Sequence, residues 1–136
     1  IGYVERTEVQ SHPEWIDKWK VYVPESNNIG TELNDDNQNS FVGAPGTICT
    51  ETYLVVGAEL NLTQDEASHL SDYLRSRFAR FLLSLAKISQ HGTGKTYRFI
   101  PLQDFSKSWT DAELYAKYGL TAEEIDFIEA KIKPME

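Results

Sequence analysis

The residues best suited to chemistry in this chain form a run of positive side chains. Between Tyr73 and Gln103 the sequence holds six basic residues and no acidic one, although the chain of 136 residues carries a net charge of −8. A positive face inside an acidic protein is typical of a surface that binds an anionic partner. A solvated face whose arginines pair with carboxylates from elsewhere is an equally good interpretation. The basic residues are Arg75, Arg77, Arg80, Lys87, Lys95 and Arg98.

The second candidate is a long polar segment, residues 25–46, that is rich in asparagine. It has almost no apolar anchor between Leu33 and Phe41, and a loop of this length in a compact domain is usually functional or disordered. Asparagine both donates and accepts hydrogen bonds, which suits it to reading the edges of DNA bases. An ordinary surface loop in which asparagines supply turns is the alternative, and both remain open. The candidate residues are Asn27, Asn28, Thr31, Asn34, Asn37 and Asn39.

Two stretches look like known binding motifs but do not fit them. Residues 92–96 resemble the end of a phosphate-binding P-loop, but Ser89 stands where the first glycine belongs and the flanking elements come in the reverse order. Residues 35–39 resemble a calcium loop that lacks its glycine and its closing glutamate. The three histidines lack metal-ligand spacing, and Cys49 has no base nearby in sequence. We therefore expect no metal site and no catalytic residue.

One long amphipathic helix is expected to position the basic residues. Thr63 and Glu66 have the spacing of a capping box. Apolar residues then recur at steps of three and four, which places them on one face. The sequence thus predicts a helix from Thr63 up to a glycine turn at residues 92–94, followed by a strand at residues 95–100. The apolar face comprises Ala67, Leu70, Leu74, Phe78, Phe81, Leu85 and Ile88.

The rest of the chain predicts two further strands and two short helices. Residues 18–23 alternate as a strand with one buried face, ended by Pro24, and residues 47–56 form a strand closed by Gly57. Capping boxes at residues 110–113 and 121–124 begin the two helices of a C-terminal tail, residues 109–136, the first of which stops at Gly119. The predicted fold is mixed α/β (α+β), a small mixed sheet packed on one long helix.

Length and composition fit a single domain, residues 1–136, with a real core. An apolar content of 40% is that of a globular chain, and the one cysteine excludes an internal disulfide. No run of residues is long and apolar enough for a membrane span, and no signal peptide is visible, so we expect a cytoplasmic protein. Because the chain starts at Ile1, we expect a piece of a longer polypeptide.

Four stretches carry a resemblance to a known family: residues 27–37, 46–53, 78–82 and 95–106, the last followed by Trp109-Thr110-Asp111. They resemble the C-terminal target recognition (specificity) domain of Eco57I-like, type IIG adenine-specific restriction–modification enzymes, and the resemblance extends from about Ser11 to Glu136. In that family the domain belongs to a polypeptide with an N6-adenine methyltransferase domain and, often, a nuclease domain. The resemblance implies a bacterial defence protein that recognises double-stranded DNA and positions the target site for methylation or cleavage.

The catalytic signatures of that family are absent from this chain. It has no Asn or Asp followed by two prolines and an aromatic residue, no glycine-rich S-adenosylmethionine loop, and no nuclease cluster ending in Glu-x-Lys. The resemblance therefore implies that S-adenosylmethionine, and Mg²⁺ for cleavage, are bound by other domains of the parent enzyme. A net charge of −8 opposes non-specific DNA binding. A neighbouring domain of the parent enzyme would supply the missing positive surface.

The expected DNA interface divides into two parts that share one concave side. Basic residues and the glycine turn contact phosphates, which sets register without reading sequence. The asparagine-rich segment and His91 reach base edges. The alternative function is a protein–protein docking module, in which Arg75, Arg77 and Arg80 bind a partner domain. The phosphate-contacting candidates are Arg75, Arg80, Lys87, Thr93, Lys95 and Arg98.

Overall fold

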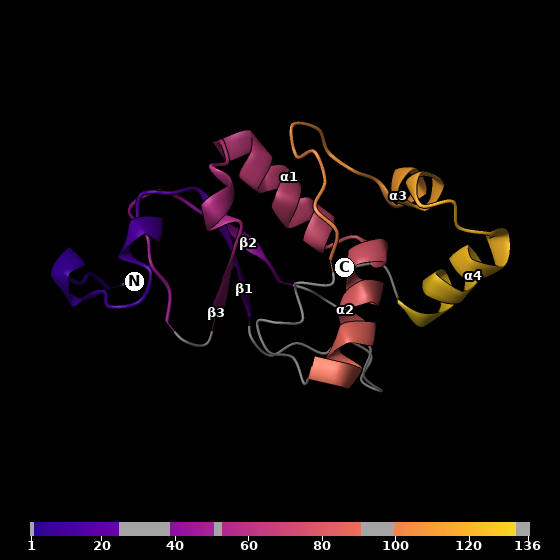
Figure 1. Cartoon of the computed structure of the whole chain (residues 1–136), viewed down its shortest axis with the longest axis horizontal. Helices are drawn as coiled ribbons and strands as arrows, with labels where there is room; N and C mark the ends of the chain where they lie inside the picture. Colours follow the sequence, from indigo (N-terminus) through magenta and orange to yellow (C-terminus); the bar gives the residue numbers. More distant parts are fainter. Residues whose placement is uncertain (1, 25–38, 51–52, 91–99, 133–136) are drawn as a thin grey trace.

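The computed structural model describes residues 2–24, 39–50, 53–90 and 100–132, with the backbone alone for residues 86–90. It is a mixed α/β fold, as predicted: a small sheet is covered by helix α1, and helices α2 to α4 extend the molecule to one side (Figure 1). The strands are β1 (Lys20–Pro24), β2 (Phe41–Gly43) and β3 (Tyr53–Val56), and the helices are α1 (Gln64–Leu74), α2 (Arg77–Gln90), α3 (Asp111–Lys117) and α4 (Ala122–Lys131). Short 3₁₀ helices lie at Arg6–Glu8, Pro13–Trp15 and Ala58–Leu60.

The described strands form an antiparallel sheet in the order β2-β1-β3, where a mixed sheet was expected. Val21 pairs with Val42 on one side and Val56 on the other, so these side chains share a face, and they pack in the same core cluster as Leu70 and Leu74 of α1. Strand β1 ends at Pro24, as predicted, but the expectation of one buried face was wrong. Lys20, Val21, Tyr22 and Val23 are all buried, because β1 is central and the N-terminal segment contributes contacts on its second face.

The single long helix of the prediction is in fact two helices, α1 and α2, separated at Arg75 and Ser76. The Ser76 hydroxyl donates to the Tyr73 carbonyl over 2.6 Å and accepts from the Ala79 N–H over 3.1 Å, which ends one helix and begins the next. The Asp111 carboxylate accepts a second N–H of the new helix, that of Phe78, over 3.0 Å. The break lets α1 pack on the sheet while α2 packs on α3 and α4 (Figure 1).

All three predicted capping boxes are present, at Thr63–Glu66, Thr110–Glu113 and Thr121–Glu124. Gly57, with a φ of 85°, follows β3 as expected, and Gly119, with a φ of 64°, follows α3. Strand β3 begins only at Tyr53, later than predicted. Strand β2 was not predicted, because three residues inside a polar segment give no periodic signal. The predicted glycine turn and residues 95–99 of the predicted strand lie outside the described residues.

The C-terminal helices belong to the same core as the sheet. Leu114 of α3 and Ile128 of α4 are buried in the cluster that contains Phe78 and Ala79 of α2, and Ile132 is buried against Leu83. The apolar face predicted for the last helix is therefore confirmed at Ile128 and Ile132. Among the helices of the described ranges, none is long and apolar enough to cross a membrane.

Candidate functional site

The two segments expected to bind DNA are attached to the same short part of the fold, the last turn of α1. Ser40, which directly follows the last candidate asparagine, Asn39, bonds through its hydroxyl to the Ser71 hydroxyl over 3.0 Å, and its carbonyl accepts from the Arg75 guanidinium over 2.6 Å. Pro101, which follows the predicted glycine turn and strand, accepts through its carbonyl from the Tyr73 hydroxyl over 2.9 Å. Ser71, Tyr73 and Arg75 therefore fix the ends of both segments within one helical turn. We call these three residues the tether turn.

Two residues of the tether turn are buried, and the third is exposed to solvent. Ser71 and Tyr73 are buried, and Tyr73 packs its ring against Phe105 with centroids 5.7 Å apart. Burial raises the pKa of the Tyr73 phenol to about 12, so the hydroxyl stays protonated and remains a donor to Pro101. Arg75 is exposed, so one guanidinium nitrogen holds Ser40 while the group faces solvent.

The arginines of the predicted basic face have different environments. Arg77 forms an ion pair with Glu129 of α4, with 2.9 Å between nitrogen and oxygen. Arg80 is only 1% exposed and donates from Nε to the Arg75 carbonyl over 2.9 Å, so its side chain lies inside the fold, whereas a phosphate contact needs it at the surface. A guanidinium buried to this extent needs acceptors within the fold. Of these three arginines, Arg75 alone offers its charge to a partner.

The remaining predicted site residues are only partly described. Asn39 is exposed and directly precedes the tethered Ser40. Lys87 lies on α2, where the backbone alone is described. The others lie outside the described residues: Asn27, Asn28, Thr31, Asn34, Asn37, His91, Thr93, Lys95 and Arg98.

Sequence reasoning missed Ser71 and Tyr73 as the residues that attach the two segments. A signal for Ser71 was present, because it lies four residues after Ala67 and three before Leu74, within the apolar face of α1. A serine at such a position is buried and must find a hydrogen-bond partner, which here is Ser40. Tyr73 gave no comparable signal, since its acceptor lies far along the chain.

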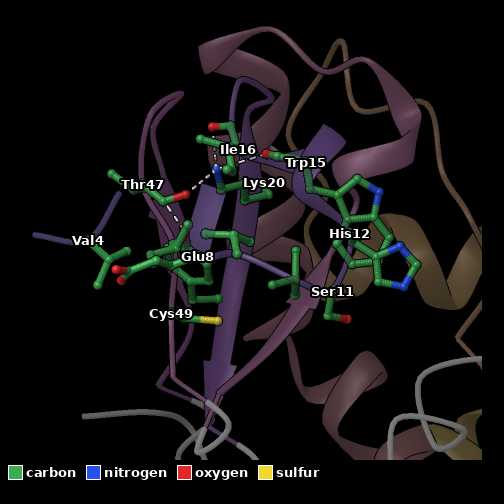
Figure 2. Close-up of a pocket in the computed structure, with 13 residues that line it drawn as sticks. Val4, Glu8, Ser11, His12, Trp15, Ile16, Lys20, Thr47 and Cys49 are labelled. Atoms are coloured by element: carbon green, nitrogen blue, oxygen red, sulfur yellow. Dashed lines mark hydrogen bonds between the residues drawn. The ribbon is translucent and has the colours of Figure 1, made fainter. Parts of the chain in front are cut away.

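A cavity of about 350 Å³ separates the N-terminal segment from the second face of the sheet. Figure 2 shows the Lys20 ammonium at one wall of this cavity, with the His12 and Trp15 rings at another. The ammonium donates to the carbonyls of Trp15, Ile16 and Thr47 over 3.1, 3.0 and 2.8 Å. Its three protons are thus all engaged, and Lys20 joins the N-terminal segment to the loop before β3.

Two other polar groups around this cavity, those of Thr47 and Cys49, are occupied or weakly reactive. The Thr47 hydroxyl donates to the Ala44 carbonyl and contacts the Tyr22 hydroxyl at 2.9 Å. Burial raises the pKa of the Cys49 thiol, which keeps it in the unreactive protonated form at neutral pH. The cavity is therefore apolar space bounded by a structural lysine. Within the described residues, no three side chains of histidine, cysteine, aspartate or glutamate are grouped so that they could hold a metal ion.

Comparisons with protein-family models, with curated proteins and with solved structures found no match for this chain.

Proposed function

We propose that this chain is a sequence-specific double-stranded DNA recognition domain that positions a target adenine for an N6-adenine methyltransferase or a restriction endonuclease. The observation that supports the proposal is the tether turn. It bonds Ser40, which follows the last candidate asparagine, and Pro101, which follows the predicted glycine turn and strand, to one short part of the fold. Base reading needs a fixed register between phosphate contacts and base contacts, and a common anchor provides it.

The positive charge for this interface comes from fewer residues than the sequence suggested. Arg77 is paired with Glu129 and Arg80 is buried, which leaves Arg75, Lys87, Lys95 and Arg98 for phosphate contacts. Four such contacts would lower duplex affinity roughly 100-fold between about 50 and 200 mM salt. The asparagines of residues 27–39 supply the base contacts, at about 1–3 kcal/mol of discrimination for each good bidentate pair. S-adenosylmethionine, and Mg²⁺ for cleavage, would be bound by other domains of the parent polypeptide.

The test begins with selection of duplexes from a random pool by the 136-residue chain, followed by titration of the enriched duplex at several salt concentrations. Lys95→Ala is expected to weaken binding to all duplexes alike and to reduce the salt slope by about one. Asn34→Ala is expected to relax the preference at one base position.

Lys107→Ala is the matched control for the loss of one positive charge, because Lys107 pairs with Glu113 and lies over the Trp109 ring, near α3. Equal effects of Lys95→Ala and Lys107→Ala on duplex affinity would show that Lys95 acts through the net charge of the chain and not through a phosphate contact. Failure to enrich any duplex, or binding without salt dependence, would refute the DNA-recognition function.

A further inference from the structure

Helices α2 and α4 enclose a groove that the DNA proposal does not use. It has a volume of about 300 Å³ and is lined mainly by Phe81 of α2, Leu120 of the α3–α4 turn and Phe127 of α4. The Phe81 and Phe127 rings meet edge to face with centroids 5.9 Å apart. Ile128 is buried at the base of the groove. We call this feature the α2–α4 groove.

Large apolar side chains are exposed in the groove and close to it. The Phe127 side chain is 60% exposed, although it is the largest apolar residue on its helix. Leu85, which follows Phe81 by one turn of α2, is 46% exposed. Large apolar side chains gathered on one surface mark interaction sites more often than single scattered ones do.

The edge of the groove is negative. Glu123 and Glu124 line it, and Asp126 is exposed on the same helix. None of the ion pairs between described residues involves these three carboxylates, whereas Glu129 is paired with Arg77. The Glu124 carboxylate accepts from the Thr121 N–H in the capping box, whereas no bond between described residues engages Glu123 or Asp126. An apolar groove with such carboxylates beside it repels a phosphate backbone and attracts a positively charged polypeptide.

We propose that the α2–α4 groove binds an amphipathic helix of a protein partner, with apolar residues on one face and lysine or arginine beside them. One large apolar side chain of the partner packs into the groove against Phe81, Leu120 and Phe127, and its positive residues face Glu123 and Asp126. This is the helix-in-groove mode of recognition. It reverses the charge of the docking module expected from the sequence, because Arg77 and Arg80 are engaged within the fold and the acids of α4 face outward. The inference does not depend on DNA binding.

The test uses three synthetic helical peptides that share one apolar face and carry lysine, glutamine or glutamate on the polar face. Binding to the 136-residue chain is measured by calorimetry, and the contacted residues by amide chemical shifts. We expect the lysine peptide to bind most tightly and the glutamate peptide most weakly. The amide chemical shift changes should be concentrated on α4 and the first two turns of α2. Phe127→Ala is expected to lower affinity for the lysine peptide about tenfold or more, as truncation of a central aromatic anchor does.

Leu102→Ala is the matched control, because Leu102 is 69% exposed and contributes nothing to the groove. Since Phe127 is mostly exposed, its truncation should leave the fold intact, which a thermal melt checks. Reversal of the rim with Glu123→Lys and Asp126→Lys should invert the peptide order.

Three results would overturn the proposal. One is equal binding of the lysine and glutamate peptides, and another is no binding of the lysine peptide at about 1 mM. The third is a dimer of the chain that Phe127→Ala dissociates, which would make a second copy the occupant. None of these outcomes bears on duplex binding, so this inference and the proposed function can fail separately.

Discussion

Replacing Lys20 with methionine tests whether one buried ammonium attaches the N-terminal segment to the sheet. The substitution keeps the length of the side chain and removes three hydrogen bonds, those to the carbonyls of Trp15, Ile16 and Thr47. An acceptor left unsatisfied in the interior costs about 1–3 kcal/mol. The bond to Ile16 is buried, while the other two are only part-buried, so water can replace the donor there.

The opposing contribution is the cost of burying the charge. Burial lowers the pKa of the Lys20 ammonium, which means that desolvation disfavours the charged form in the folded state. Methionine does not carry this cost and packs against the apolar cavity wall. The net loss of unfolding free energy should therefore be about 2–3 kcal/mol, below the sum for three fully buried acceptors. For a chain of this size the melting temperature should fall by roughly 6–12 °C.

Lys18→Met is the matched control, two residues earlier in the chain. The Lys18 ammonium makes one exposed hydrogen bond, 2.7 Å to the Asn61 side chain, so its loss should cost about 0.5 kcal/mol or less. Urea unfolding followed by tryptophan fluorescence gives both values at pH 7. The wild type should also gain stability as the pH rises towards the ordinary lysine pKa of about 10.4, because the lowered pKa of Lys20 lets the unfolded chain bind more protons there. Lys20→Met should lack that rise.

The reasoning fails if Lys20→Met is as stable as Lys18→Met. Such a result would mean that the three carbonyl bonds do not outweigh the desolvation of the ammonium. Lys20→Met could also be as stable as Lys18→Met and yet show faster amide exchange at residues 13–16. That result would contradict the estimated free energy, but it would still show that Lys20 attaches the N-terminal segment.

The remaining predictions concern the fold that holds the candidate sites. Because the pKa of Tyr73 is about 12 when folded and about 10 when unfolded, Tyr73 alone should lower the stability of the wild type by roughly 3 kcal/mol between about pH 10 and 12, and urea titrations of Tyr73→Phe should show a smaller loss. Ser76→Ala removes the hydroxyl that accepts from Ala79 and should cost about 0.5–2 kcal/mol, whereas an unchanged urea midpoint would show that the helix break does not need it. Gly43→Ala places a methyl 2.5 Å from the Tyr22 ring and should cost about 1–3 kcal/mol, a value that an unshifted melting temperature would contradict.

The parts of this fold that could be predicted from sequence are those specified by neighbouring residues. The Thr-x-x-Glu spacing placed the starts of α1, α3 and α4, because a capping box needs only its own four residues. Pro24 and Gly57 marked the ends of β1 and β3 for equally local reasons. Period-two alternation located β1, although it gave the wrong burial for Lys20.

The parts that could not be predicted depend on residues distant in sequence. The helix break at Ser76 contains no glycine or proline, and one of its two side-chain acceptors comes from Asp111. Arg80 is buried and donates to the Arg75 carbonyl at that break, a contact that the sequence pattern does not indicate. Strand β2 exists because β1 pairs with it, and its own sequence gives little indication. DNA recognition itself stays a prediction.

The contact between Phe78 and Asp111 has a consequence for the order of assembly. The Phe78 N–H, at the start of α2, donates to a carboxylate 33 residues later in the chain. During synthesis on a ribosome, this N–H therefore lacks its acceptor until Asp111 has emerged. A nascent chain arrested before Thr110 should expose the start of α2 to proteases and chaperones, and release of the final helices should abolish that sensitivity.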